Sequence, residues 1–136
     1  MDIIDKYVLG ISFGYHDSAV ALLKNGKVLS AVEEERFTGI KHDNSFPKHS
    51  IKWITKENGI SVNDISFVCF YENPDLKNDR NKKLYFKYWY KNIFGWKKKD
   101  TSTDYLAWFF PNAKILAGNH HLSHLAYSYY TSPFQS

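Results

Sequence analysis

The sequence predicts an α/β fold, in which helices pack on a mixed sheet that begins with an antiparallel three-stranded meander. Three apolar runs follow one another near the N-terminus, and an Asn-Gly pair joins the second to the third. A helical stretch and further apolar runs then alternate along the chain, which is typical of helices layered on one sheet. With 136 residues, 43% of them hydrophobic, the chain can form one compact domain with a core.

The meander is predicted from the first 34 residues. Its three apolar runs cover residues 7–13, 18–24 and 28–34. Asn-Gly, at positions 25–26, is the sequence most typical of a two-residue hairpin turn. The turn between the first two runs, "GYHD", carries Gly14, His16 and Asp17. We therefore expect a compact polar turn at the end of the first strand.

A helix and a fourth strand should follow. Pro47 suits the first turn of a helix, in which Ile51 and Ile54 recur at helical spacing until Gly59 ends it. The next apolar run, residues 66–71, is the fourth strand.

The sequence pattern that follows the fourth strand is less regular. Residues 73–104 are rich in aromatic side chains, which fit a helix as well as a strand, and a second helix is expected near residues 103–110. Residues 113–118 then predict a short strand. The last helix begins after Asn119, whose side chain can accept hydrogen bonds from the first amides, and ends at Pro133.

Composition excludes several classes of protein. Cys69 is the single cysteine and lies in an apolar run, so a disulfide framework is impossible and a buried structural thiol in a reducing compartment is expected. No apolar stretch approaches the roughly 20 residues of a membrane helix, which favours a soluble, cytoplasmic protein without membrane contact. The net charge of +4 comes largely from residues 77–83 and 97–99. Solvated loops explain these runs better than nucleic-acid binding, because the nearby aromatics are not spaced for base stacking.

Three histidines cluster in "NHHLSH". His120 and His124 are four residues apart, so on a helix their imidazoles share one face and can converge on one metal ion. His121 points about 100° away and should not share that ion. The motif lacks the glutamate of the zinc-protease helix, and two histidines at this spacing are equally typical of a solvated helix surface. Any further ligands must come from outside the motif.

The turn "FGYHDSA" is a second candidate site. Its exposed amides, with Gly14 allowing close approach, can contact a phosphate or an acyl group. His16 can accept a proton at neutral pH. However, Gly14 and Asp17 are also common turn formers, and this simpler interpretation is favoured by the turn alone.

Charged residues follow the third strand in "EEERF" and "IKHDNSFP". The three glutamates, residues 33–35, should alternate faces, so that one pairs with Arg36 while its neighbours face solvent. Lys41 and His42 are expected in a loop that returns over the sheet edge, where a lysine can hold a phosphate as a point charge.

In this order, the motifs "FGYHDSA", "EEERF", "KH" and "HHLSH" resemble the N-terminal part of the carbamoyltransferase family that includes the nodulation protein NodU and the cephalosporin and tobramycin carbamoyltransferases. The likeness runs through about the first 75 residues and returns in about the last 20. The four motifs in one order are far more specific than any one of them.

The resemblance implies an architecture and an activity. Residues 1–136 would be the first portion of an actin/Hsp70/sugar-kinase-like (ASKHA) domain, and a YrdC-like C-terminal domain would make carbamoyladenylate from carbamoyl phosphate and ATP. The N-terminal domain would pass the carbamoyl group to a small-molecule acceptor, a hydroxyl of a sugar, antibiotic or polysaccharide.

The resemblance also implies residue roles. His120 and His124 match the two histidines that bind a divalent metal, commonly iron. His16 matches the histidine at the acyl-transfer centre, and Lys41 matches a lysine that contacts carbamoyladenylate. Ser12 and Gly14 lie on the same turn and would approach the acceptor or the nucleotide.

Set against the family pattern, the remaining metal ligands, the second half of the nucleotide cleft and the YrdC-like domain are not in these 136 residues. Two imidazoles leave most of the coordination to water, so we expect weak metal binding and no transfer by this chain alone. Two alternatives stay open: an ATP-dependent kinase or ATPase of the same fold, and a non-catalytic interaction module. Exposed apolar patches would favour self-association, with the remainder of its own chain as the expected partner.

Overall fold

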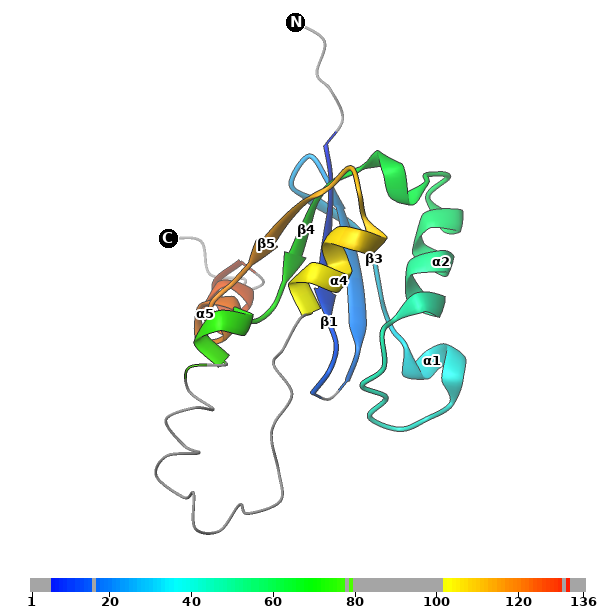
Figure 1. Cartoon of the computed structure of the whole chain (residues 1–136). Coiled ribbons are helices and arrows are strands. Elements are labelled where there is room, and N and C mark those ends of the chain that lie inside the picture. Colours follow the sequence, from blue (N-terminus) through cyan, green and yellow to red (C-terminus); the bar gives the residue numbers. More distant parts are fainter. Residues whose placement is uncertain (1–5, 16, 78, 80–101, 131, 133–136) are drawn as a thin grey trace, which may run out of the picture.

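The computed structural model describes residues 6–15, 17–77, 79, 102–130 and 132. A five-stranded sheet forms its centre, with the strand order β3-β2-β1-β4-β5 (Figure 1). The strands are β1 (Tyr7–Ser12), β2 (Ala19–Lys24), β3 (Lys27–Glu33), β4 (Ile65–Phe70) and β5 (Lys114–Ala117). Because β2 is antiparallel to β1 and β3, while β4 is parallel to β1 and β5, the predicted mixed sheet and its opening meander are confirmed.

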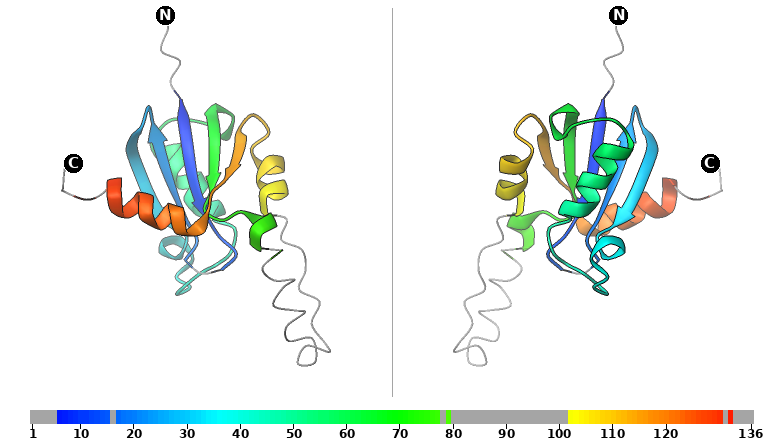
Figure 2. Two further views of the ribbon diagram at one scale, coloured as in Figure 1. Left: turned by 90° about the vertical axis from the view of Figure 1, so that its left-hand side faces the viewer. Right: turned by 90° about the vertical axis from the view of Figure 1, so that its right-hand side faces the viewer.

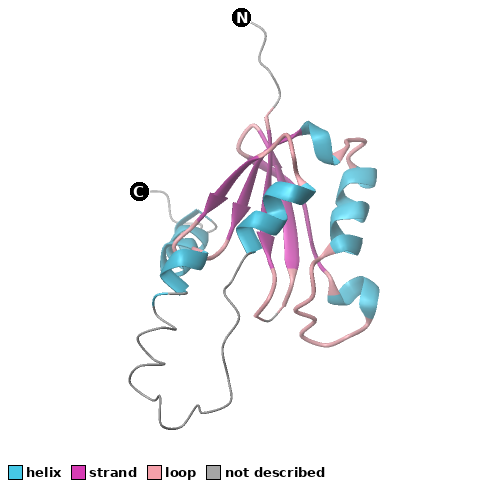
Figure 3. Cartoon of the chain, in the orientation of Figure 1, coloured by secondary structure: helices cyan, strands magenta, loops and turns pink. Residues whose placement is uncertain are grey.

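Helices cover both faces of this sheet. They are α1 (Glu35–Thr38), α2 (Lys48–Glu57), the 3-10 helix η1 (Val62–Asp64), α4 (Ser102–Phe109) and α5 (His120–Tyr130). Figure 2 shows α2 and α5 on opposite faces, with α5 crossing near the lower end of the strands. The alternation of helices and strands in the chain is visible in Figure 3.

The core lies between the sheet and the helices α2 and α4. Every second residue of a strand faces the same side, so Leu9 and Ile11 of β1 are buried together on one face of the sheet. The buried cluster also contains Val20, Leu22, Ile51, Ile54, Ile65, Val68, Phe70, Leu106 and Phe110. The predicted helical spacing of Ile51 and Ile54 is confirmed, since both are buried on one face of α2.

One prediction about local structure needs correction. The charged segment after the third strand was expected to continue as a strand end, but α1 forms there. The carbonyl of Glu34 accepts hydrogen bonds from the amides of Phe37 and Thr38, and Gly39 ends the turn with φ 69°. Of the aromatic segment 73–104, residues 78 and 80–101 lie outside the described residues, and the helix or strand interpretation of that part stays a prediction.

Cys69 is half-buried rather than fully buried, and burial raises the pKa of its thiol. Within the described part of the chain, no helix is long and apolar enough to cross a membrane.

Candidate functional site

All the candidate residues that the structure describes gather at one edge of the sheet. The strands β1, β3, β4 and β5 run in the same direction, so their carboxyl ends meet at this edge. The turn 13–18 follows β1, the loop 39–46 follows β3 and α1, and α5 follows β5. Segments far apart in the sequence are therefore neighbours in the fold (Figure 1).

The paired histidines stand on the first turns of α5. The helix begins as predicted, because the Asn119 side-chain oxygen accepts hydrogen bonds from the amides of His121 (3.0 Å) and Leu122 (3.3 Å). The imidazoles of His120 and His124 face each other, with 3.2 Å between their Nε2 atoms. The sequence spacing is thus converted into a close pair of nitrogen donors.

This spacing can be compared with the needs of a metal ion. A ligand nitrogen lies about 2.0–2.1 Å from a zinc ion, so two nitrogens on one ion are roughly 2.8–3.4 Å apart for angles between 90° and 109°. The observed 3.2 Å falls in this interval, and it also suits an N–H···N hydrogen bond between the rings. Within the described ranges, no cluster of three or more His, Cys, Asp or Glu side chains could hold a metal. The pair alone thus fits two positions of a coordination sphere.

His120 is anchored against the sheet. Tyr71, directly after β4, contacts the His120 ring edge to face, with 5.6 Å between the ring centroids. The amide of Gly118 donates to the carbonyl of Phe70 (2.9 Å), which brings the start of α5 beside β4. A Cβ atom at position 118 would lie 3.2 Å from the Ser123 hydroxyl oxygen. This close approach of the start of α5 favours glycine at position 118.

Replacing Asn119 by alanine should destabilise α5, because two amides in its first turn lose their acceptor. Loss of such a cap costs about 1 kcal/mol. Urea unfolding should show a free energy of unfolding that is lower by this amount in Asn119→Ala. Asn119→Ser keeps an acceptor oxygen and should recover most of the lost stability. Equal unfolding of the alanine variant and the parent protein would contradict the capping role.

The turn 13–18 is held by the loop 39–46. The amide of Gly14 donates to the Asn44 carbonyl (2.9 Å), and the amide of Ser18 donates to the Asp43 carbonyl (2.7 Å). The Ser18 hydroxyl donates to the carbonyl of Ser45 (2.6 Å). Gly14 has φ 88°, a conformation that favours glycine. These contacts bring the segments "GYHDS" and "KHDNS" together, although the contacting residues lie 25 or more positions apart in the chain.

Asp43 shapes the loop from within. Its side chain is buried and accepts hydrogen bonds from the Ser45 amide (2.8 Å) and the Thr38 hydroxyl (2.8 Å). Hydrogen bonds from the Ser45 side chain and amide, followed by that from Thr38, hold the pKa of the Asp43 carboxyl below its usual range. The ionised carboxylate therefore orders the loop that carries Lys41.

The predicted site residues can now be placed. Ser12 ends β1, and its hydroxyl donates to the Asp17 carbonyl (3.3 Å). Gly14 lies in the turn and Lys41 is exposed on the loop packed against that turn. His16, the candidate base, lies outside the described residues. The structure thus joins the turn and the Lys41 loop, and sets the paired imidazoles at the same sheet edge.

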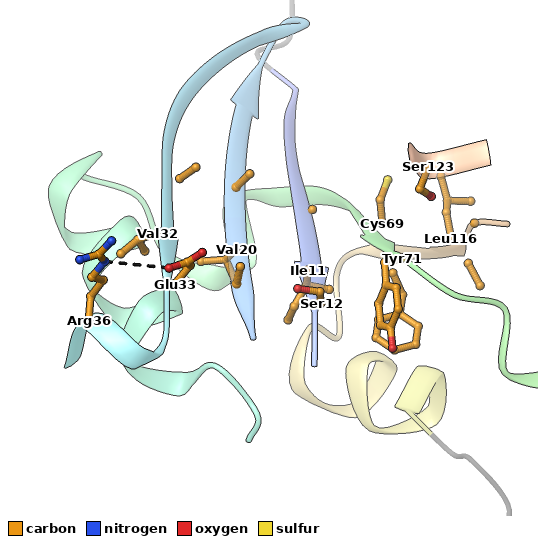
Figure 4. A pocket seen from close by; sticks show the side chains of 17 residues that line it. Ile11, Ser12, Val20, Val32, Glu33, Arg36, Cys69, Tyr71, Leu116 and Ser123 are labelled. Atoms are coloured by element: carbon orange, nitrogen blue, oxygen red, sulfur yellow. Dashed lines mark ion pairs between the residues drawn. The ribbon is translucent and has the colours of Figure 1, made fainter. Parts of the chain in front are cut away.

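A hollow of about 810 Å³ extends over the sheet face opposite α2 (Figure 4). Small side chains form its floor, because the residues that alternate with the buried core positions are Gly10, Ser12, Ala19, Ala21, Ala31 and Cys69. Ser123 of α5 lines it as well, so the histidine helix borders the same space as Ser12 and Ala19, which flank the turn. At its rim Arg36 pairs with Glu33 at 3.9 Å, which confirms that one glutamate of "EEERF" pairs with this arginine.

Glu34 is the residue whose importance the sequence interpretation missed. It was expected to face solvent, but its side chain is fully buried at the start of α2. Its carboxylate accepts hydrogen bonds from the amides of His49 (3.1 Å) and Ser50 (2.8 Å), the Ser50 hydroxyl (2.6 Å) and His49 Nδ1 (2.7 Å). One sequence signal pointed this way: Pro47, which directly precedes α2, has no side chain able to cap the helix.

An α/β protein with polar loops and paired imidazoles at the carboxyl ends of its strands belongs to a class in which that edge is the usual place for ligands. The family follows from comparison with known proteins. The model of the family described as "Carbamoyltransferase N-terminus" matches residues 7–136, and the chain belongs to this family.

Several longer proteins are similar to the chain. An uncharacterized protein of Synechocystis sp. is 35% identical over 152 aligned positions, which cover 94% of the chain and 24% of that protein. The nodulation protein NolNO of Sinorhizobium fredii is 36% identical over 69 positions, covering 51% of the chain and 10% of that protein. An uncharacterized protein of Methanocaldococcus jannaschii is 31% identical over 96 positions, covering 63% and 18%. The chain thus spans a quarter or less of these three relatives.

Proposed function

We propose that the protein is part of an O-carbamoyltransferase that moves a carbamoyl group from carbamoyladenylate to a hydroxyl of a sugar, antibiotic or polysaccharide. Family membership over residues 7–136 supports carbamoyl transfer in general. Within the ASKHA-type domain that we propose, the strand order β3-β2-β1-β4-β5 would form the first half. Carbamoyladenylate would be made from carbamoyl phosphate and ATP elsewhere in the full-length protein.

The reaction assigns roles to the turn and the loop. The acceptor oxygen attacks the carbamoyl carbon, the bond from that carbon to the phosphate oxygen breaks, and AMP leaves while the hydroxyl proton passes to a base. We assign the base to His16 and the binding of the donor phosphate to Lys41. Ser12 and Gly14, which border this turn, would contact the acceptor or the nucleotide.

His120 and His124 would hold a divalent metal, iron in the first place. The observation that carries this assignment is the 3.2 Å between their Nε2 atoms at the carboxyl edge of the sheet. Imidazole nitrogen suits iron, zinc and copper, and the remaining ligands would come from outside the described residues. A metal in this position would supply Lewis-acid polarisation of an oxygen atom of a bound substrate.

Product analysis of the full-length protein tests the function. Incubation with ATP, carbamoyl phosphate carrying a labelled carbon, and a panel of hydroxyl acceptors should give labelled acceptor and AMP. A kinase or ATPase of the same fold would instead release ADP and leave the carbamoyl label untransferred. We expect no transfer by the 136-residue chain alone, and transfer lost in the His16→Ala variant. Full turnover by that variant would reject the base assignment.

An interaction module is the second candidate, because three large apolar side chains are exposed among those that the structure describes on α5. Leu122, Leu125 and Tyr129 are 63%, 67% and 62% exposed. Exposed apolar surface of this kind favours contact with another protein surface. Sedimentation of the chain over a range of concentrations tests self-association. A full-length protein that stays monomeric while transferring carbamoyl groups would exclude the module as its function.

A further inference from the structure

Asp17 and His42 form a side-chain bridge between the turn 13–18 and the loop 39–46. Their atoms Oδ1 and Nδ1 are 2.8 Å apart, although 25 residues separate them in the chain. Both residues have positive φ, 46° for Asp17 and 57° for His42, which is uncommon for residues other than glycine. Such backbone conformations persist where the surrounding contacts over-determine them, and they cluster at functional sites.

The bridge is the exposed part of a set of hydrogen bonds that joins the turn to the loop. Beneath it, the amides of Gly14 and Ser18 donate to loop carbonyls at 2.9 and 2.7 Å. On its other side, the amide of His42 donates to Glu35 Oε2 at 3.0 Å. His42 is thereby held from two directions, by the turn through its ring and by α1 through its backbone.

Lys41 directly precedes His42, so the bridge fixes the backbone from which the lysine side chain extends. A lysine has a long flexible side chain, and a fixed backbone reduces the conformational freedom that is lost on binding. We propose that Asp17 and His42 are a positioning pair that presents the Lys41 ammonium to the phosphate of the carbamoyl donor. That Lys41 contacts the donor phosphate rests on the proposed function, whereas the bridge between Asp17 and His42 does not.

The strength of the bridge should depend on pH. The hydrogen bond that His42 donates to Asp17, followed by the negative charge of Asp17, raises the pKa of His42, and Glu35 adds to this in the same direction. Among the described residues, these two carboxylates are the charged groups that act on the ring. Because the pKa is raised, the charge-assisted bridge is complete below the ordinary value near 6.5 and weakens as the pH rises through the raised pKa. Donor binding should weaken over the same interval.

Kinetics of the full-length protein, with carbamoyladenylate supplied as donor, test the positioning role. In His42→Ala we expect the KM for the donor to rise roughly tenfold while kcat changes less than about threefold, since a ground-state contact is weakened. His42→Asn is the matched variant, because asparagine tolerates positive φ and offers an amide donor. It should recover most of the affinity. An unchanged KM in His42→Ala, or equal impairment of both variants, would overturn the proposal.

A double variant asks whether His42 acts through Lys41. If it does, the double variant should have nearly the same KM for the donor as Lys41→Ala, because both substitutions remove the same interaction. Fully additive effects would overturn the positioning role.

Two measurements separate the bridge from the reaction. NMR titration should place the pKa of His42 above its ordinary value in the parent protein and lower it in Asp17→Asn. Exchange of the Ser18 amide should become faster in His42→Ala. An unshifted His42 and unchanged exchange would refute the bridge even if transfer is observed. A raised pKa in a protein without any transfer would refute the proposed function and the lysine role, leaving the bridge as structure.

Discussion

Replacing Glu34 by alanine is expected to lower the free energy of unfolding by about 3 kcal/mol, because a buried acceptor with several partners is removed. The Glu34 carboxylate joins the end of β3 to the start of α2 through the amides of His49 and Ser50 and the Ser50 hydroxyl. Without it, the amide and hydroxyl of the buried Ser50 would lack an acceptor, and the part-buried amide of His49 would lose its acceptor as well. Urea unfolding followed by circular dichroism measures the difference.

The neighbouring Glu33 offers a matched control. It belongs to the same acidic run, but it is exposed, and its contact with Arg36 is 3.9 Å long. Exposed ion pairs contribute about 0–1 kcal/mol, so Glu33→Ala should unfold almost like the parent protein. If both alanine variants lost the same stability, the effect would come from general charge removal and the capping role of Glu34 would be wrong.

The ionisation of Glu34 adds a pH dependence. Burial alone would raise the pKa of its carboxyl, but the hydrogen bonds from Ser50 and His49 outweigh burial, and the pKa is lowered. A lowered pKa means that the contribution is complete above the unfolded value of 4.5 and is lost as the pH falls through the folded value. The parent protein should therefore lose stability below about pH 4.5 more steeply than Glu34→Gln does.

Removal of both paired imidazoles is the second large effect. The His120→Ala, His124→Ala double variant should bind Fe(II) or Zn(II) at least about a hundredfold more weakly than the parent protein, since even outer-shell partners of a metal site contribute 10–100-fold. Anaerobic calorimetric titration of the full-length protein measures this. His121→Ala is the control. His121 follows His120 in α5 and is exposed, and its ring is not part of the close Nε2 pair of His120 and His124.

Proton competition should accompany metal binding by these residues. An imidazole must be neutral to coordinate a metal, so the affinity of the parent protein should fall as the pH is lowered. The His121→Ala variant should follow the parent at every pH. Equal metal affinity in the parent and the double variant would show that the 3.2 Å contact is only a hydrogen bond between two surface rings.

Local chemistry explains which parts of the fold were predictable. The hairpin at Asn25 and Gly26 was predicted from two residues, and both adopt the positive φ, 51° and 82°, that such a turn needs. The cap at Asn119 was predicted in the same way, since its partners lie two and three residues along the chain. Hydrogen bonds that form within a few residues leave a pattern in the sequence.

Tertiary contacts leave no such pattern. The carboxylate of Glu34 reaches residues 15 and 16 positions away, and Asp17 reaches a ring 25 positions away. In each case the sequence shows a charged residue in a polar run, which is equally typical of a solvated loop. The sequence therefore predicted the candidate residues Ser12, Gly14 and Lys41, but not the buried carboxylates of Glu34 and Asp43 that organise the segments beside them.

X-ray absorption at the iron edge counts the imidazoles on a bound ion most directly. In the full-length protein loaded with one Fe(II), the spectrum should contain at least two imidazole ligands. The His124→Ala variant loaded in the same way should show one fewer, and His121→Ala should be unchanged. An identical ligand count in the parent protein and His124→Ala would contradict the shared metal site of His120 and His124.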